Sequence, residues 1–234
     1  FRGAVRCISG WAEISYNVFT GNETSGIVCE RGSEVDIHHN TISNNTGRGI
    51  YCEESTPRME YNRIENTSGG GIDLRDCEAD PAGPSWSISH NVIVRNSATE
   101  GGAIRCEDSN PDISFNTIVY NNAGSGAGIY VSGNRRVHVH HCIIYANTGG
   151  GAGIHVAGPA WAFSIDHCDV CVRGHPNYEG ISDATGTNGN ISTNPMFAYP
   201  SRTSTSGDYH LMSTVGRWDP ATRSWKTSYA QSAC

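Results

Sequence analysis

The sequence predicts an all-β chain: a right-handed, single-stranded parallel β-helix, a solenoid of about seven coils plus an irregular C-terminal cap. Three observations carry this prediction. A strand-like segment with a fixed asparagine recurs along the chain, and a second strand-like segment recurs with it after glycine-rich turns. A third is composition, because only 37% of residues are hydrophobic whereas 28 are glycine. Such a composition is typical of disorder or of a chain that turns at short intervals, and the repeat favours the second.

The first repeated segment has an apolar residue three positions before its centre and Phe, Ile or Val two positions after it. Its seven copies are ISYNVF, IHHNTI, MEYNRI, ISHNVI, ISFNTI, VHHCII and IDHCDV, centred on Asn17, Asn40, Asn62, Asn91, Asn116, Cys142 and Cys168. The centres lie 23, 22, 29, 25, 26 and 26 residues apart. Units this short bury a core only by stacking. We expect each asparagine to adopt the left-handed conformation of a bend and to bond to the asparagines above and below it.

The second repeated segment is a short strand of the Gly-Ile type. By the two-residue period of a strand, one column of its side chains faces inward. That column is Cys7, Cys29, Cys52, Leu74, Cys106, Val131 and Val156. The intervening outward column is Arg6, Val28, Tyr51, Asp73, Arg105, Tyr130 and His155.

The repeat predicts two regions, residues 1–172 as β-helix and residues 173–234 as an irregular tail. An open coil end exposes core and strand edges, so we expect the tail to cover it with Tyr209, Leu211, Trp218 and Trp225. The net charge is −7 and no basic stripe occurs, which disfavours nucleic acid as a partner. No apolar run is long enough to predict a membrane span.

The segments FTGN (19–22) and GGAI (101–104), with the recurring N-x-I-x-x-N, resemble the parallel β-helix repeats of bacterial surface and secreted proteins. That superfamily includes pectate-lyase-like enzymes and outer-membrane adhesins. The resemblance covers about residues 4–172 and is specific for fold, not for activity. It implies an exported protein with an extracellular or cell-surface location.

In the pectate-lyase-like enzymes that the fold resembles, the groove follows one such sheet. The outward positions of the Gly-Ile strands are therefore the candidate glycan-binding face. Its residues are Tyr51, Glu53, Asp73, Arg75, Arg105, Glu107 and Tyr130. Rings suit sugar faces, and charged groups suit hydroxyls or uronates. Asp73, Glu107 and Arg105 are weak catalytic candidates, since a carboxylate pair can serve as acid and base. Opposite charges on neighbouring coils also simply pair on a solvated sheet.

Two further groups are candidates. Asp112, His138, His140 and Asp166 fall on the outward face of consecutive asparagine strands and are weak metal-ligand candidates, with a plain surface cluster as the alternative. Cys142 and Cys168 replace asparagine in the ladder and are a candidate disulfide, which favours an oxidising compartment. His39, His90, His141 and His167 share a column with aromatic residues and are expected to stack. No cofactor is expected, and calcium has no supporting motif.

Three functions remain open. The first is an exported β-helix module that binds polysaccharide or partner surfaces without catalysis. The second is a polysaccharide lyase or glycoside hydrolase, which the short turns and the missing catalytic motifs disfavour. The third is a structural stalk or filament segment that contacts copies of itself or flanking domains.

Overall fold

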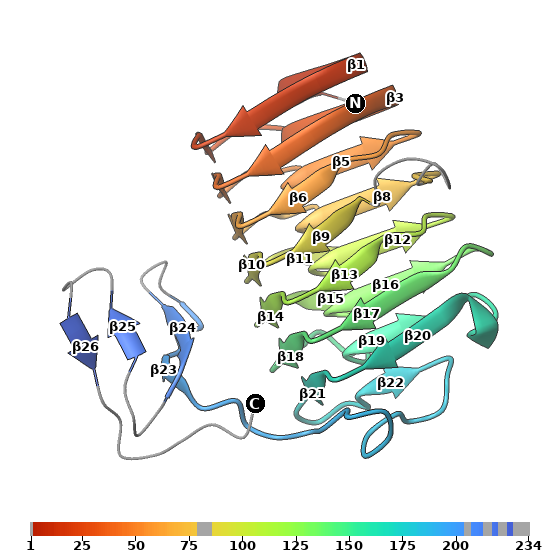
Figure 1. The fold of residues 1–234 in the computed structure, drawn as a ribbon, viewed down its shortest axis with the longest axis vertical. Helices are drawn as coiled ribbons and strands as arrows, with labels where there is room; N and C mark the ends of the chain where they lie inside the picture. Colours follow the sequence, from red (N-terminus) through yellow and green to blue (C-terminus); the bar gives the residue numbers. More distant parts are fainter. Residues whose placement is uncertain (1, 79–85, 204–206, 213–216, 220–223, 227–234) are drawn as a thin grey trace.

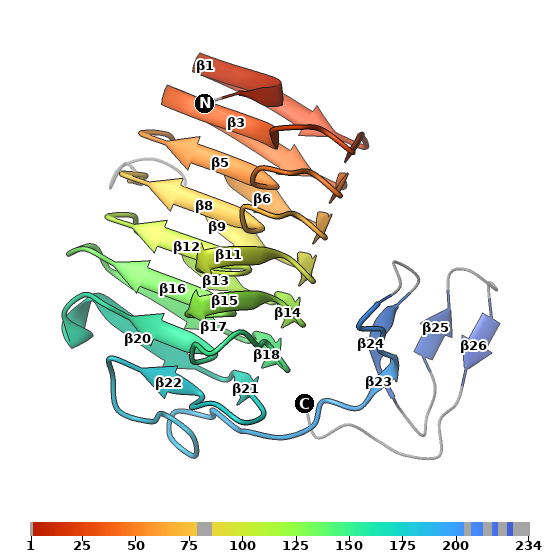
Figure 2. The same ribbon diagram turned by 180° about the vertical axis from the view of Figure 1, so that it is seen from behind.

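The computed structural model describes residues 2–78, 86–203, 207–212, 217–219 and 224–226. Short parallel strands stack in coils along one axis to form a rod, and a C-terminal segment lies beside its lower part (Figures 1 and 2). Within the described ranges, the helical element is a single 3₁₀ turn, η1 (Ala160–Ala162). The predicted all-β parallel solenoid is confirmed.

The largest sheet has thirteen strands in two wings that meet at β3 (Ser25–His38), which also pairs with β1 (Gly3–Ser15). The glycine-isoleucine wing contains β5 (Ile50–Glu53), β8 (Ile72–Arg75), β12 (Ile104–Glu107), β16 (Ile129–Ser132), β19 (Ile154–Val156) and β22 (Tyr178–Glu179). The asparagine wing contains β6 (Arg58–Glu60), β9 (Ser87–Ser89), β13 (Asp112–Ser114), β17 (Val137–His140) and β20 (Phe163–Asp166). Each wing thus collects one of the two repeated segments.

A seven-stranded sheet closes the coils on the third side. It contains β2 (Val18–Thr20), β4 (Thr41–Ser43), β7 (Arg63–Glu65), β10 (Val92–Val94), β14 (Thr117–Val119), β18 (Ile143–Tyr145) and β21 (Asp169–Cys171). Two turns add a small parallel sheet of β11 (Ser97–Glu100) and β15 (Asn122–Ser125). Two antiparallel pairs follow the rod, namely β23 (Phe197–Tyr199) with β24 (Asp208–Leu211) and β25 (Arg217–Asp219) with β26 (Ser224–Lys226).

Like residues stack in the core because every coil repeats the same register. The predicted inward column is confirmed from Cys7 through Cys29 and Cys52 to Val156. Next to it runs a column of isoleucines, each completely buried from the second coil on: Ile27, Ile50, Ile72, Ile104, Ile129 and Ile154. Each buried isoleucine contributes about 1.5–3 kcal/mol relative to an exposed one.

The asparagines form the predicted ladder. The Asn91 backbone N–H donates to Asn116 Oδ1 at 2.9 Å, and the Asn91 amide donates to the Met59 carbonyl at 2.9 Å. The same bonds link the other buried asparagines of this column. A second ladder runs through Asn22, Asn45, Asn96, Asn121 and Asn147, with Thr67 in one coil. The side chains thereby satisfy backbone groups that a bend leaves unpaired.

The left-handed residue at each bend is the one before the asparagine, so that part of the prediction was wrong. Tyr16, His39, Tyr61, His90, Phe115, His141 and His167 all have φ between 48° and 57°. A left-handed residue bends the chain at the corner and points its own side chain outward, and the following residue then points inward to its hydrogen bonds. The strain of a left-handed non-glycine residue is of order 1 kcal/mol and is offset by those bonds.

Stacked pairing continues past residue 172. Tyr178 pairs beside Ile154, and Asn190 Oδ1 accepts the Cys168 backbone N–H at 3.0 Å as a further ladder position. Ile181 and Ala184 pack against the main core. The apolar side chains that extend the core beyond the repeat therefore come from residues soon after residue 172, and not from the predicted cap residues.

Tyr209 and Leu211 lie elsewhere, so their predicted place over the coil end was wrong. They pack with Val94, Val119 and Tyr145 on the outer side of the seven-stranded sheet. Val94 and Val119 point outward from this sheet, and the C-terminal side chains bury them completely. Burial of these two apolar side chains explains why Tyr209 and Leu211 pack here and not over the coil end. The side chains of Trp218 and Trp225 lie outside what the structure describes.

Candidate functional site

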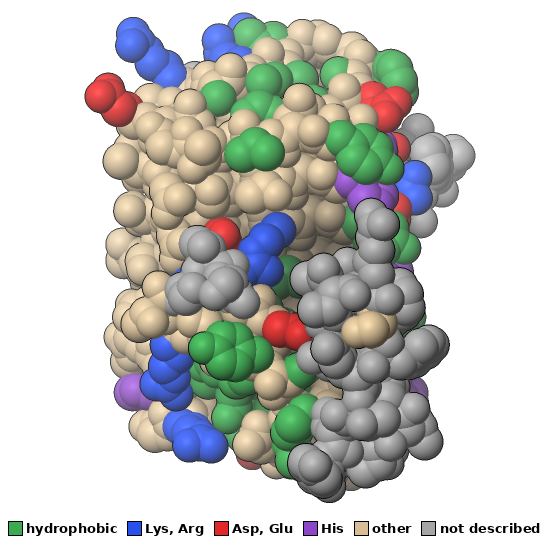
Figure 3. Space-filling model, turned by 90° about the vertical axis from the view of Figure 1, so that its left-hand side faces the viewer, with side chains coloured by type: hydrophobic (Ala, Val, Ile, Leu, Met, Phe, Trp, Pro, Cys, Tyr) green, Lys and Arg blue, Asp and Glu red, His purple; other side chains and the backbone are tan. Residues whose placement is uncertain are grey.

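The glycine-isoleucine wing holds all seven predicted glycan-binding residues on four adjacent strands. Tyr51, Asp73, Arg105 and Tyr130 stand in one outward column, and Glu53, Arg75 and Glu107 stand in the next. Glu53, Arg75, Arg105, Glu107 and Tyr130 are partly exposed. This charged face is distinct from the one in Figure 3, which is viewed from the side of the C-terminal segment and is mostly tan in its upper half.

Asp73 is the centre of an arginine cluster. Its side chain is only 4% exposed, and its carboxylate pairs with the guanidinium groups of Arg48, Arg75 and Arg105. The Arg75 and Arg105 contacts are each 3.3 Å. Asp73 thus holds three cations on adjacent coils, and a buried carboxylate needs such partners. Arg48 was not among the predicted site residues.

Arg105 links this cluster to two more carboxylates. Its Nη1 donates to Glu107 at 2.7 Å, and its Nε donates to Glu100 at 3.3 Å. Burial alone lowers the pKa of the Arg105 guanidinium, but Glu107 and Asp73 outweigh burial and raise the pKa above its ordinary value. Arg105 is therefore a fixed cation.

The three catalytic candidates contact one another as ion pairs. Asp73 and Glu107 both bind Arg105, and Glu107 also lies 3.7 Å from Arg75. A general acid must hold a proton and a general base must present a lone pair to the substrate. Both carboxylates instead direct oxygens to guanidinium groups, which makes this a charge network of the kind that holds side chains in place.

Tyr51 is completely buried, which corrects its expected role as a platform for a sugar ring. The guanidinium carbons of Arg48 and Arg75 lie 5.0 Å and 5.7 Å from its ring centroid. Burial is the main cause that raises the pKa of the Tyr51 hydroxyl. The ring supports two arginines from beneath by cation–π contact. Tyr130 is the more exposed ring and lies beside Arg105, at 5.9 Å.

A groove of about 450 Å³ lies next to the cluster, between the wing and the turns of three coils. Its lining includes Arg48, Asp73, Arg75, Glu100 and Arg105, together with backbone at Gly47, Gly69 and Gly101. Residues of β11 and the following turn line one side of the groove. Figure 2 shows this strand next to β12. Gly101 has φ of +61°, and a Cβ there would lie 2.6 Å from the Ile104 carbonyl oxygen, so the turn requires glycine.

Sequence reasoning missed this wall, although a signal for it exists. In each coil a turn connects the asparagine of the second ladder to the Gly-Ile strand. This turn spans four residues from Asn45 to Gly49 but seven residues from Asn96 to Ala103. The extra residues are those that pair as β11 and β15. A turn that lengthens in consecutive coils therefore predicts a wall along one side of the glycine-isoleucine wing.

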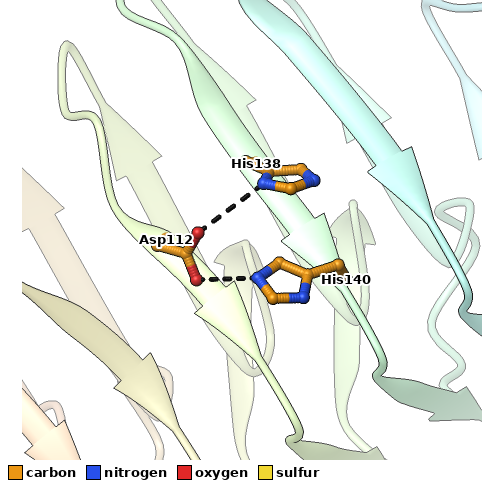
Figure 4. Close-up of side chains that lie close together, drawn as sticks. All are labelled: Asp112, His138 and His140. Carbon is orange, nitrogen blue, oxygen red and sulfur yellow. Dashed lines mark hydrogen bonds and ion pairs between the residues drawn. The ribbon is translucent and has the colours of Figure 1, made fainter.

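The predicted metal-ligand candidates come together on the asparagine wing. Asp112 lies on β13, and His138 and His140 lie on the neighbouring β17 (Figure 4). The Asp112 carboxylate is 3.0 Å from His140 Nε2 and 3.6 Å from His138 Nδ1. Asp166 on β20 accepts from His138 Nε2 at 2.7 Å.

The left-handed bend residues stack in one column along the edge of the asparagine wing. Ring centroids of Tyr16, His39, Tyr61, His90, Phe115, His141 and His167 follow one another at 4.8–5.1 Å. The predicted stacking role of the four histidines is confirmed. Ring faces inside the column are occupied by neighbouring rings, so only ring edges meet solvent.

Eight cysteines, Cys7 to Cys171, are free thiols in the part of the chain that the structure describes. Cys142 and Cys168 take ladder positions as sulfur acceptors: Cys142 Sγ lies 3.4 Å from the Asn116 nitrogen, and Cys168 Sγ lies 3.3 Å from the Cys142 nitrogen. The structure holds both as thiols, so a disulfide between them stays a prediction for the oxidised protein.

Stacked coils, asparagine ladders and an isoleucine-lined core define a parallel β-helix repeat protein. The family model described as right handed beta helix region matches residues 8–82. The structure and the match over residues 8–82 together support a right-handed parallel β-helix repeat fold. No curated protein and no solved structure matches the chain. Among the described residues, no helix has the length and apolar character that crossing a membrane requires.

Proposed function

We propose that this β-helix module binds acidic polysaccharide along the glycine-isoleucine wing, without cleaving it. The observation that carries the proposal is the arginine cluster around Asp73 in the groove. The charged lining residues comprise three arginines against two acids, Asp73 and Glu100. Guanidinium groups recognise carboxylates through paired N–H donors.

The groove suits a chain of acidic sugars in both shape and preorganisation. It runs across several coils, and its glycine-rich floor lets a ligand approach the backbone. The ion pairs with Asp73 and the ring of Tyr51 already hold Arg48 and Arg75 in position. A ligand therefore orders few side chains on binding, which lowers its entropic cost.

Binding is tested by calorimetry with polygalacturonate, a uronate polymer, and with neutral dextran as the comparison ligand. We expect binding to polygalacturonate only. Replacing Arg75 by Gln removes one charged hydrogen-bonding group and should weaken binding by about tenfold to a hundredfold, the equivalent of about 1.5–3 kcal/mol. Arg58→Gln is the matched control, since Arg58 is also ion-paired but lies on the asparagine wing.

Catalysis is tested in the same samples. Release of unsaturated or reducing ends from polygalacturonate would support a lyase or hydrolase and contradict the proposal. Equal affinity of the wild type and Arg75→Gln for polygalacturonate would show that the ligand binds outside this groove.

The stalk alternative has one observation in its favour. β1 pairs on one side with β3, and the first coil exposes Ile8, Trp11 and Val18 at 43%, 72% and 68%. A strand edge with apolar side chains beside it is a surface that a further coil or a second copy of the chain can cover. Concentration-dependent growth of rods in sedimentation, combined with no polysaccharide binding, would favour this function instead.

The location outside the cell belongs to the same proposal, because uronate polymers are extracellular ligands. Fractionation of cells that produce the protein tests it. Recovery only from the cytosol would contradict an exported module.

A further inference from the structure

A second cluster of polar side chains lies on the asparagine wing, whereas the groove lies on the glycine-isoleucine wing. Asp112 and His138 are direct neighbours in the parallel pairing of β13 and β17, and His140 follows two residues later on the same face. Figure 4 shows the three side chains directed toward one another. Their ligand atoms all lie within 4.8 Å of one another.

We propose that Asp112, His138 and His140 bind one divalent transition-metal ion of the zinc class. Two imidazoles and one carboxylate suit such ions, whereas calcium and magnesium prefer oxygen ligands alone. In a tetrahedral zinc site with bonds of about 2.0–2.2 Å, ligand atoms lie roughly 3.3 Å apart. The distance from Asp112 Oδ1 to His140 Nε2 is 3.0 Å and that from Asp112 Oδ2 to His138 Nδ1 is 3.6 Å, so each carboxylate oxygen lies near that separation from one imidazole.

Asp166 positions His138 for this role. Its Oδ2 accepts from His138 Nε2 at 2.7 Å, which places the imidazole proton on Nε2 and leaves Nδ1 as the lone pair that faces Asp112. Metal-binding histidines commonly have such a carboxylate on their second nitrogen.

His140 has a corresponding partner. Its Nδ1 lies 2.9 Å from His141 Nδ1, and one of these two nitrogens must donate to the other. With the proton on His140 Nδ1, its Nε2 offers a lone pair next to Asp112 Oδ1. A metal ion would then lie between His140 Nε2 and Asp112 Oδ1, in place of their direct contact.

Solvent can supply the remaining ligands. The side chains of Asp112, His138 and His140 are 40%, 39% and 20% exposed. Three protein ligands with open coordination positions can accept water or an oxygen or nitrogen of a further ligand. The ion would also join two adjacent coils at their outer surface.

The test uses the full chain with zinc chloride in calorimetry and with cobalt(II) in absorption spectroscopy. We expect one ion per chain, with a cobalt spectrum that lacks thiolate charge transfer. Asp112→Asn, His138→Gln and His140→Gln should each lower affinity by about tenfold or more, and Asp166→Asn by about tenfold to a hundredfold. His155→Gln is the matched control, because His155 is 20% exposed and lies 3.3 Å from Glu179 on the other wing.

Zinc should also raise the melting temperature of the wild type and of His155→Gln, since an ion that binds the folded state stabilises it. The metal-free variants should keep the circular dichroism and melting temperature of the wild type, because these side chains lie outside the core. Wild-type protein that binds no ion, a thiolate band, or unchanged affinity in both histidine variants would overturn the proposal.

Discussion

At the scale of single residues, buried asparagines replace the backbone partners that a bend cannot supply. Asn91 donates its amide protons to the carbonyls of Met59 and Ser89 and to Asn116 Oδ1. Its own Oδ1 accepts the backbone and side-chain N–H groups of Asn62. One side chain therefore satisfies polar groups of several coils, and the ladder is as much a part of the core as the isoleucines.

Asn91→Ala should destabilise the protein by about 3 kcal/mol, because it leaves buried donors and acceptors without partners. The measurement is chemical denaturation followed by circular dichroism. Asn134→Ala is the control, since Asn134 is exposed, and it should change stability by less than about 0.5 kcal/mol. Equal effects of the two substitutions would contradict a structural role for the ladder.

Cys142→Asn should stabilise the protein by about 1 kcal/mol, because an amide forms shorter and stronger hydrogen bonds than a thiol. The Cys142 sulfur is 3.4 Å and 3.9 Å from the two Asn116 nitrogens, whereas ladder amides make the equivalent bonds at about 3 Å. A higher midpoint in urea is the expected result. A lower midpoint would show that the coil at this level cannot hold an amide.

At the scale of strands and turns, the cysteines of the inward column show how the position of a thiol controls its reactivity toward alkylating agents. Cys52 and Cys106 are completely buried, and burial raises the pKa of each thiol. Cys171 ends β21 and is only half-buried. Alkylation requires thiolate and access.

Iodoacetamide at neutral pH should therefore modify Cys171 well before Cys52 and Cys106, as judged by peptide mapping in a mass spectrometer. In denaturant without reductant, Cys142 and Cys168 should both label if they are free thiols. Protection of this pair alone would establish the disulfide. Early labelling of Cys52 in the native protein would contradict the buried column.

The strands and their columns could be predicted because a two-residue period and a repeated register leave little choice. The bends could not, since asparagine adopts the left-handed backbone more readily than the aromatic residue before it, and only the structure shows that the asparagine side chain is instead needed inside for its hydrogen bonds. The groove depended on Arg48, which precedes Gly49 and meets Asp73 only through the stacking of coils. The histidine cluster was identified by column, but its diagonal contacts between Asp112 and His140 required side-chain positions.

At the scale of the whole molecule, net charge and local charge have opposite signs. The chain carries −7 overall, yet the groove gathers three guanidinium groups on adjacent coils. The two lining acids, Asp73 and Glu100, leave an excess of one positive charge, and a cleft with such an excess can attract an acidic ligand even when the rest of the surface repels it.

Affinity for polygalacturonate should accordingly fall as salt rises, because both the attraction and the contacts are electrostatic. Titrations from low to high sodium chloride test this. Affinity that is independent of salt would indicate recognition through hydroxyl groups or rings.

The stacking of coils also predicts the order in which parts of the rod unfold locally. Each coil contacts only its neighbours, so stability is set by coil-to-coil interfaces, and coils at an end have one interface in place of two. In the described structure, β1 and β22 each pair with a single strand, β3 and β19 respectively, whereas β8 and β12 pair on both sides. Backbone amides of β1 and β22 should exchange with deuterium first, and those of β8 and β12 last.

Hydrogen exchange with mass spectrometry measures this order. Asn91→Ala should speed exchange in the strands next to its coil more than in β1, because the lost bonds belong to the interfaces on either side of Asn91. Uniform exchange across all coils would mean that the rod unfolds as one cooperative unit. In that case the interfaces are strong compared with the stability of a single coil, and substitutions at any level would lower protection everywhere by the same amount.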